Sequence, residues 1–341
     1  MRVKLAGMLL TLISGAALAQ VGGLMNAEVS ERTSINDPAR AVHSMNGPWL
    51  AFSLPVLEGT RSPCCWKGKW NSYREMGCSL EGAHQSYGTR SDSPLTENVI
   101  AYARVSGGEV DSLRVMGEQC PMEADGAKVA WIGSVDTDAG LDWLESVARS
   151  GNGSTKGTAL YALGLHRSNE ANDRLYALAK EFSGDLAGEA IFWLGEARGV
   201  DGFDALKRLL TELPNGDSRR EINFALAQNG SKPASDLLSD ISQSDRDPEQ
   251  RGTALFWLAE EFPEIAPDLL LEALTGEQDE DVQEQAIFAI SQLPAEVSTP
   301  LLLELASDKQ MPRGLRRQAL FWLANSDDDE AVAALAELLT H

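Results

Sequence analysis

The sequence lacks the residues on which most catalytic and metal sites depend. Only four histidines occur among 341 residues, and we find no Gly-rich phosphate loop, no nucleophile elbow and no His-Glu-x-x-His motif. Nothing in the sequence groups a nucleophile with a base and a residue that orients it. We therefore expect no catalytic residues, no metal and no cofactor, and we predict that the protein is not an enzyme.

Long apolar runs are also missing after the first twenty residues. No later stretch approaches the roughly 18 apolar residues of a membrane span, so we expect no membrane insertion. The start is different, because Arg2 and Lys4 precede an uncharged apolar stretch that ends in the small-x-small site Ala17-Leu18-Ala19. This pattern predicts a signal peptide over 1–19, cleaved near Ala19-Gln20, and a periplasmic or secreted protein.

Basic residues are scarce relative to acidic ones. The chain holds 51 Asp and Glu against 29 Lys and Arg, and from Val135 onward the ratio is 38 to 17, a net charge of −21. A surface this negative repels phosphate backbones, so we expect no nucleic-acid partner. Keeping a long helical surface soluble accounts for much of this acidity.

Cysteine is absent from the C-terminal two-thirds of the chain. The four cysteines are Cys64, Cys65, Cys78 and Cys120. An even number in an exported chain predicts disulfides, with three possible pairings. A bond between the neighbours Cys64 and Cys65 would strain the peptide, so each is expected to pair with Cys78 or Cys120. A zinc or copper site is the alternative, since the loop 61–88 also contains His84.

The region around these cysteines has the pattern of strands. The stretch Trp49–Val56 alternates in part, and Val99–Val105 is expected to pair with Val110–Met116 across a short turn. We predict a flexible mature N-terminus over 20–45, followed by a small β-rich domain with disulfides over 46–133.

An aromatic-centred motif recurs through the rest of the chain. Its copies read TALYALG, EAIFWLG, EINFALA, TALFWLA, QAIFAIS and QALFWLA. Their first aromatic residues are Tyr161, Phe192, Phe224, Phe256, Phe288 and Phe321, at steps of 31 to 33 residues. A fixed period of this length is typical of repeat proteins.

A leucine-rich segment lies between successive copies of the motif. Spacings such as Leu206, Leu209, Leu210 and Leu213 are helical, and breakers such as Asn229-Gly230 separate the segments. Each period is therefore a helical hairpin that must stack on its neighbours to bury its apolar face. We predict a mainly α fold over 134–341, with about six hairpins and a capping helix near 330–339.

The alternating helices with an Ala-x-x-x-Leu-Gly core resemble the HEAT-like repeats of phycobilisome-lyase relatives. That resemblance implies a right-handed α-α superhelix whose second helices line the concave side. Iron-binding members of the group use paired His-Glu dipeptides, and this chain has none. The chain, with an exported cysteine-bearing β segment before the repeats, also resembles exported HEAT-repeat proteins of Gram-negative bacteria. That resemblance implies a periplasmic location and no established activity.

Tryptophan and alanine alternate after the repeat aromatic. One interpretation is packing between hairpins, and the other is a face that contacts a partner. The candidate partner-binding residues are Phe192, Trp193, Phe256, Trp257, Phe321 and Trp322. We predict a non-catalytic scaffold for a protein or peptide partner. The alternatives are a HEAT-like lyase or other enzyme-associated subunit, and a redox or metal sensor that uses the cysteine loop.

Overall fold

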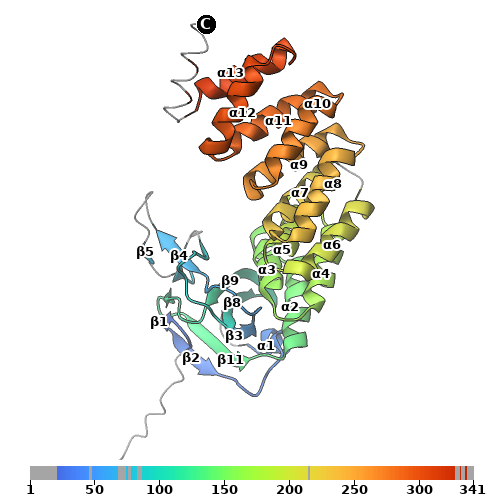
Figure 1. Ribbon diagram of the computed structural model, residues 1–341. Coiled ribbons are helices and arrows are strands. Elements are labelled where there is room, and N and C mark those ends of the chain that lie inside the picture. Colours follow the sequence, from blue (N-terminus) through green and yellow to red (C-terminus); the bar gives the residue numbers. More distant parts are fainter. Residues whose placement is uncertain are drawn as a thin grey trace, which may run out of the picture.

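The computed structural model describes residues 21–45, 48–67, 74–75, 78–82, 87–213, 216–326, 331 and 335. A β-rich domain lies at one end of a curved array of helices (Figure 1). The predicted signal peptide and His84 lie outside the described residues, as does the predicted capping helix except for Ala331 and Leu335. Among the described residues, no helix is long and apolar enough to span a bilayer.

The β-rich domain is built on a five-stranded sheet. Its strands, in spatial order, are β2 (Glu28–Glu31), β11 (Lys128–Ser134), β3 (Trp49–Pro55), β8 (Asn98–Ser106) and β9 (Glu109–Gly117). The first three strands pair in parallel and the others pair antiparallel. The predicted hairpin is confirmed as β8 and β9, and its turn contains Gly107 and Gly108, both with positive φ, as a tight hairpin turn requires.

Two smaller sheets contain three of the four cysteines in their strands. One contains β1 (Leu24–Met25), β10 (Met122–Glu123) and β6 (Cys78–Ser79), and the other contains β5 (Arg74–Glu75), β4 (Cys64–Lys67) and β7 (Tyr87–Gly88). The prediction of a flexible segment over 20–45 is wrong. This segment forms β1, β2 and the helix α1 (Pro38–Ser44), because parallel pairing with β10 and β11 satisfies its backbone groups.

The central strand β3 is buried on both faces, and its side chains alternate between two cores. Leu50, Phe52 and Leu54 belong to the core shared with the helices. Trp49 and Ala51 belong to a second core around the cysteines. Because side chains in a strand point alternately to opposite faces, one strand connects the cysteine layer with the helical array.

Within the described residues, twelve helices form the array. They are α2 (Thr137–Ser150), α3 (Gly153–Leu165), α4 (Glu170–Glu181), α5 (Asp185–Glu196), α6 (Gly199–Glu212), α7 (Gly216–Asn229), α8 (Lys232–Ser244), α9 (Pro248–Glu261), α10 (Ala266–Gly276), α11 (Glu280–Gln292), α12 (Ala295–Ser307) and α13 (Arg313–Ala324). The prediction of about six hairpins is confirmed. Several helices begin at side chains that cap backbone amides, including Asp136, Asn152, Ser231, Asp247 and Asp279.

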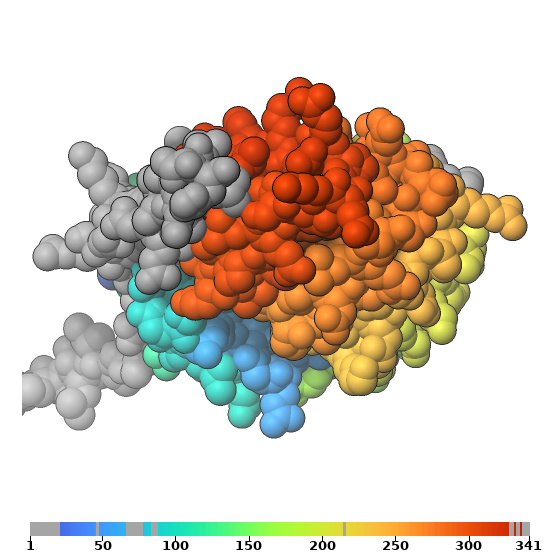
Figure 2. Space-filling model, turned by 45° about the horizontal axis from the view of Figure 1, so that its top comes forward, coloured from blue at the N-terminus to red at the C-terminus, as the bar shows by residue number. Residues whose placement is uncertain are grey.

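The helices lie in two layers. The odd-numbered helices from α3 to α13 form the inner layer, on the side toward the β-rich domain, and the even-numbered helices form the outer layer (Figure 1). Small residues let the inner helices approach closely. A Cβ added to Gly195 would lie 2.1 Å from the carbonyl oxygen of Ala225 on the next inner helix. In Figure 2 the C-terminal repeats, in red and orange, lie in front of the blue and cyan β-rich domain.

The β-rich domain joins the first repeats directly. Val56 forms an antiparallel β-bridge with His166, Leu57 N donates to Leu165 O at 2.9 Å, and Arg167 N donates to Pro55 O at 3.1 Å. One apolar core continues from the sheet through the helices to Leu323 in α13. The β-rich domain therefore closes the N-terminal end of the array, where an open repeat would expose its apolar face.

Candidate binding surface on the inner helices

The aromatic residues of the motif form one continuous row of ring contacts along the inner layer, which we call the aromatic ladder. In order of contact, its rings are Tyr161, Trp193, Phe192, Phe224, Trp257, Phe256, Phe288, Trp322 and Phe321. The centroids of consecutive rings lie 4.7 to 5.7 Å apart. These are favourable separations for aromatic pairs, so the ladder links all six repeats.

The alternation of tryptophan and alanine gives the ladder its two kinds of step. Trp257 tilts against Phe224 of the preceding repeat, with ring centroids 4.7 Å apart. Where the later repeat carries Ala225, no second large ring intervenes and Phe192 stacks directly on Phe224 at 5.6 Å. The tryptophans therefore fill the spaces between hairpins and also extend the ring contacts.

The ladder is neither fully buried nor fully exposed. Of the six predicted partner-binding residues, Phe192, Trp193, Phe256, Trp257 and Trp322 are half-buried. Phe321 is exposed, at 55 % of its full area. The structure thus brings all six onto the inner layer and leaves part of their surface open, while their role in partner binding stays a prediction.

A cleft lies at the N-terminal end of the ladder, between the β-rich domain and the inner helices α3 and α5. Its volume is about 680 Å³. Tyr161, Phe192 and Trp193 line it from the helices, together with the carboxylates of Glu189 and Glu196. Apart from the two ladder residues Phe192 and Trp193, these were not identified as site residues from the sequence.

The opposite wall of the cleft belongs to the β-rich domain and carries two cations. Arg61, in the loop between β3 and β4, and Arg114, on β9, both line the cleft. The Arg61 guanidinium donates to Ser93 O at 2.9 Å, and that of Arg114 donates to Gly82 O at 3.1 Å. Both guanidinium groups are thus bound to backbone carbonyls of their own domain.

The carboxylates on α5 lie in a negative environment. Both side chains are exposed, and their partial loss of water contact in the cleft raises the pKa of Glu189, a shift to which the charge of Asp185 adds. The same desolvation raises the pKa of Glu196, with a contribution from Glu261. Gly157 on α3 gives Glu189 its position, because a Cβ there would lie 2.6 Å from Glu189 Oε2.

A second hollow lies farther along the same face. Phe224, Phe256, Trp257 and Phe288 line it, together with Arg220 and with polar residues three positions before the repeat aromatics, and its volume is about 390 Å³. Those polar residues are Glu221, Thr253 and Gln285. The inner layer thus offers aromatic surface bordered by polar side chains at two places along the array.

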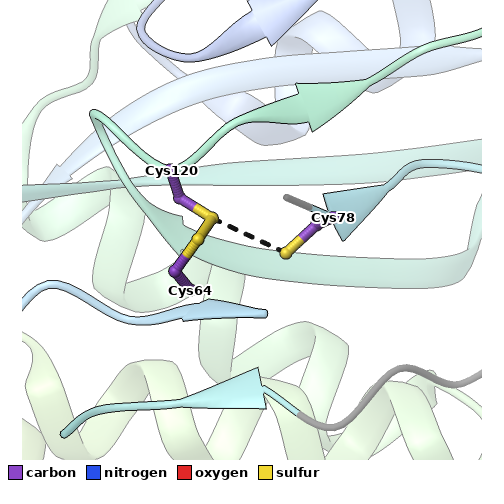
Figure 3. Close-up of side chains that lie close together, drawn as sticks. All are labelled: Cys64, Cys78 and Cys120. Atoms are coloured by element: carbon purple, nitrogen blue, oxygen red, sulfur yellow. Dashed lines mark hydrogen bonds between the residues drawn. A yellow bond between two sulfur atoms is a disulfide. The ribbon is translucent and has the colours of Figure 1, made fainter. Parts of the chain in front are cut away.

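The cysteines form two disulfides, Cys64–Cys120 and Cys65–Cys78. This agrees with the expectation that the neighbours Cys64 and Cys65 do not bond to each other. All four are buried, with 3 to 4 % exposure. The sulfurs of Cys64, Cys78 and Cys120 lie within 4.8 Å of one another (Figure 3), but in the disulfide form none is a thiolate that could bind a metal.

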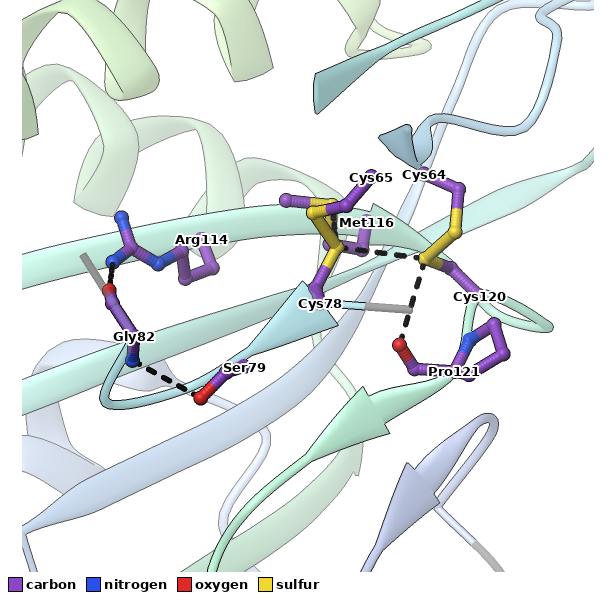
Figure 4. Close-up of a disulfide and its surroundings, with 9 residues drawn as sticks. All are labelled: Cys64, Cys65, Cys78, Ser79, Gly82, Arg114, Met116, Cys120 and Pro121. Carbon is purple, nitrogen blue, oxygen red and sulfur yellow. Dashed lines mark hydrogen bonds between the residues drawn. A yellow bond between two sulfur atoms is a disulfide. The ribbon is translucent and has the colours of Figure 1, made fainter. Parts of the chain in front are cut away.

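The two disulfides touch each other. Cys78 Sγ lies 3.6 Å from Cys120 Sγ and 3.4 Å from Met116 Sδ (Figure 4). Arg114, which lines the cleft, lies on the same strand as Met116, and its guanidinium donates a hydrogen bond to the Gly82 carbonyl. The disulfides therefore fix the segments that support this wall.

A buried arginine orders the turn between the first two repeats. Arg198 donates to Asn172 Oδ1 at 2.6 Å and to the carbonyl oxygens of Gly164, His166 and Ser168. His166 is 1 % exposed, and its Nδ1 accepts from Ser168 N at 3.2 Å. Burial, with the charges of Arg198 and Arg167, lowers the pKa of His166 to about 4. No sequence pattern pointed to Arg198, because its partners are mostly backbone carbonyls.

Comparison with known families finds a match for the last repeats. Residues 267–341 match the family model of HEAT repeats. The array is a HEAT-like repeat solenoid. The match confirms the resemblance to HEAT-like repeats over 267–341, and helical hairpins continue from there back to α2.

Two solved structures are similar to part of this chain. The complex of CpcE and CpcF of phycocyanin lyase from Nostoc sp. PCC7120 is 20 % identical, with 59 % of this chain and 87 % of that chain covered and a TM-score of 0.33. The archaeal HEAT-like repeats protein from Thermococcus onnurineus NA1 is 16 % identical, with 59 % and 89 % covered and a TM-score of 0.30. No curated protein matches the chain.

Proposed function

We propose that the protein is a non-catalytic exported scaffold that binds a protein or peptide partner on the inner layer of its HEAT-like array. The observation that carries this proposal is the aromatic ladder, which runs through all six repeats and keeps part of its surface open. Half-exposed aromatic rings bury large areas against a partner at a low cost in side-chain entropy. Rings that only packed between hairpins would not need to border hollows.

Export is part of the proposal. It is supported by the basic and apolar start of the sequence and by two disulfides, which persist in oxidising compartments. Periplasmic or secreted targeting is tested by fractionating cells that produce the full chain and sequencing its N-terminus. A mature protein that begins near Gln20 in the envelope or medium agrees with the proposal, and an uncleaved cytosolic chain contradicts it.

Site-specific photo-crosslinking tests the binding face. A photoreactive phenylalanine analogue is placed at Phe256 or Phe321 on the ladder, and at Val200, an exposed apolar residue on the outer helix α6, as the matched control. The full chain is then irradiated in the native host. We expect the same adduct from both ladder positions and none from Val200. Equal labelling at Val200, or no adduct from the ladder, would reject the proposal.

A redox sensor is the second candidate, favoured by the 3.6 Å separation of Cys78 Sγ and Cys120 Sγ in different disulfides. A thiolate freed at one sulfur would lie beside the other disulfide, as thiol–disulfide exchange requires. Titration of the folded protein with dithiothreitol separates the candidates. Reduction that leaves the fold intact supports the sensor, whereas disulfides that are reduced only on unfolding support a structural role.

A further inference from the structure

The cleft at the N-terminal end of the ladder has a distinctive arrangement on α5. Glu189, Phe192, Trp193 and Glu196 stand at positions i, i+3, i+4 and i+7, so all four lie on one face of the helix. The two carboxylates therefore flank the two rings, and all four residues line the cleft. Seven residues correspond to ~10 Å along the helix axis, which is too far for both carboxylates to bind one metal ion.

Neither carboxylate is neutralised by the protein. Helix α5 contains three acidic residues and no Lys or Arg. Within the part of the chain that the structure describes, no ion pair involves Glu189 or Glu196. Lys156, on the neighbouring helix α3, lies over the ring of Phe182, 5.3 Å from its centroid.

The outer layer provides a contrast. There, basic residues join successive repeats through ion pairs, such as Arg149 with Glu181 at 3.0 Å and Arg174 with Asp142 at 2.9 Å. Several acidic residues of the first outer helices thus have basic partners within the chain. The carboxylates of the cleft face a space of about 680 Å³ instead.

We propose that this cleft binds a basic, extended segment of the partner polypeptide, whose Lys or Arg side chains pair with Glu189 and Glu196 and whose apolar parts cover Phe192 and Trp193. The inference rests on the proposed function and adds the chemistry of the partner. Carboxylates and aromatic faces both attract cations. In an extended chain of the polyproline II type, residues three apart lie on the same face and ~9 Å from each other, which is close to the spacing of the two carboxylates.

The cations on the opposite wall restrict this proposal to one side of the cleft. Arg61 and Arg114 would repel a basic group that approached the β-rich domain. Basic side chains are therefore directed toward α5. Beyond the cleft the peptide would continue along the ladder, where Glu221 occupies the repeat position that corresponds to Glu189. The neighbouring Arg220 is paired there with Asp217 and Glu249.

The proposal is tested by calorimetric titration of the full mature chain with the peptide acetyl-Lys-Gly-Gly-Lys-amide. The matched probe is the same peptide with both lysines acetylated. We expect the basic peptide to bind and the neutral one to bind about tenfold more weakly or not at all, because the loss of a charge-assisted contact removes about 1.4 kcal/mol or more. Equal binding of both peptides, or no binding of either, overturns the proposal.

Variants of the carboxylates locate the site. Glu189→Gln and Glu196→Gln keep the size of each side chain and should each weaken binding several-fold, with little effect on unfolding. The control is Glu260→Gln, an acidic residue on α9 that is exposed like Glu189 and Glu196 but does not line the cleft, and it should bind like the wild type. Equal losses in all three variants would indicate general attraction to an acidic surface and reject the site.

The peptide-binding test of the cleft can fail independently of the crosslinking test of the proposed function. If Phe256 and Phe321 crosslink a partner but Glu189→Gln and Glu196→Gln leave peptide binding unchanged, the scaffold stands and the basic segment is wrong. If the ladder crosslinks nothing and the basic peptide still binds, the cleft is a cation site that does not belong to a partner-binding ladder.

Discussion

The rings of Phe256 and Phe288 lie parallel, with 1° between their planes and 5.7 Å between their centroids. They belong to successive repeats, and the later repeat carries Ala289 where others carry tryptophan. The small side chain leaves room for the two rings to stack directly. The pair therefore shows how the tryptophan and alanine alternation sets the geometry of the inner layer.

Replacement of Phe256 by alanine should lower the free energy of unfolding by about 2 kcal/mol. A fully buried phenylalanine costs about 3 to 5 kcal/mol on truncation, but Phe256 is only half-buried and contacts Trp257 and Phe288. Urea unfolding measures the change. Phe321→Ala, at the exposed end of the ladder, should cost less than about 1 kcal/mol. Equal costs for the two variants would contradict the lower exposure of Phe256 relative to Phe321.

His166 should make the protein less stable as the pH falls. Its pKa is about 4 in the folded protein against an ordinary value of about 6.5, so between these values the unfolded chain binds the proton more readily. The stability contributed by the neutral ring is complete above about pH 6.5 and is lost as the pH falls toward 4, by about 3 kcal/mol.

The measurement is urea unfolding from pH 7.5 to 4. His166→Leu should flatten the dependence relative to the wild type, because the variant has no imidazole to protonate at this buried position. The same slope in wild type and His166→Leu would show that the acid sensitivity arises elsewhere.

The two disulfides should contribute unequally. Cys64–Cys120 closes 56 residues and Cys65–Cys78 closes 13. In the chain-entropy model, loss of the longer loop costs about 4 kcal/mol and loss of the shorter one about 3 kcal/mol. Paired replacements by alanine, followed by guanidinium unfolding, give the order. A larger loss from Cys65→Ala with Cys78→Ala would mean that packing around Met116 outweighs loop closure.

Arg198 should stabilise the turn between the first two repeats. Arg198→Met keeps the apolar stem but leaves the carbonyls of Gly164, His166 and Ser168 without their donor, which should cost about 3 kcal/mol. Arg198→Lys should recover only part of this, because an ammonium group lacks the fork of donors. Thermal unfolding compares the variants, and full recovery by lysine would show that only the charge matters.

The periodic part of the fold could be predicted from the sequence because each repeat contacts mainly its neighbours. The steps from Tyr161 to Phe321 were enough to fix six hairpins. The hairpin of β8 and β9 is equally local. By contrast, the pairing of Leu24–Met25 with Met122–Glu123 joins distant and very short segments that have no pattern of their own. Its absence from the prediction explains why 20–45 was expected to be flexible.

Sequence patterns could likewise reveal only part of the candidate site. Phe192 and Trp193 were identified because they recur in the motif. Glu189 and Glu196 could have been found from their i and i+7 spacing around those rings. Arg61 and Arg114 could not, since only the fold of the β-rich domain brings them across from α5.

The junction between Val56 and His166 also bears on the length of any bound segment. Only Val135 and Asp136 separate β11 from α2, and the sheet shares its core with the repeats. The cleft and the exposed ring of Phe321 are thus held at a set distance by packed hairpins, without a linker between them. Under the proposed function, a partner that occupies both ends must be long enough to reach across the array, so its binding would depend on its length as well as on its charge.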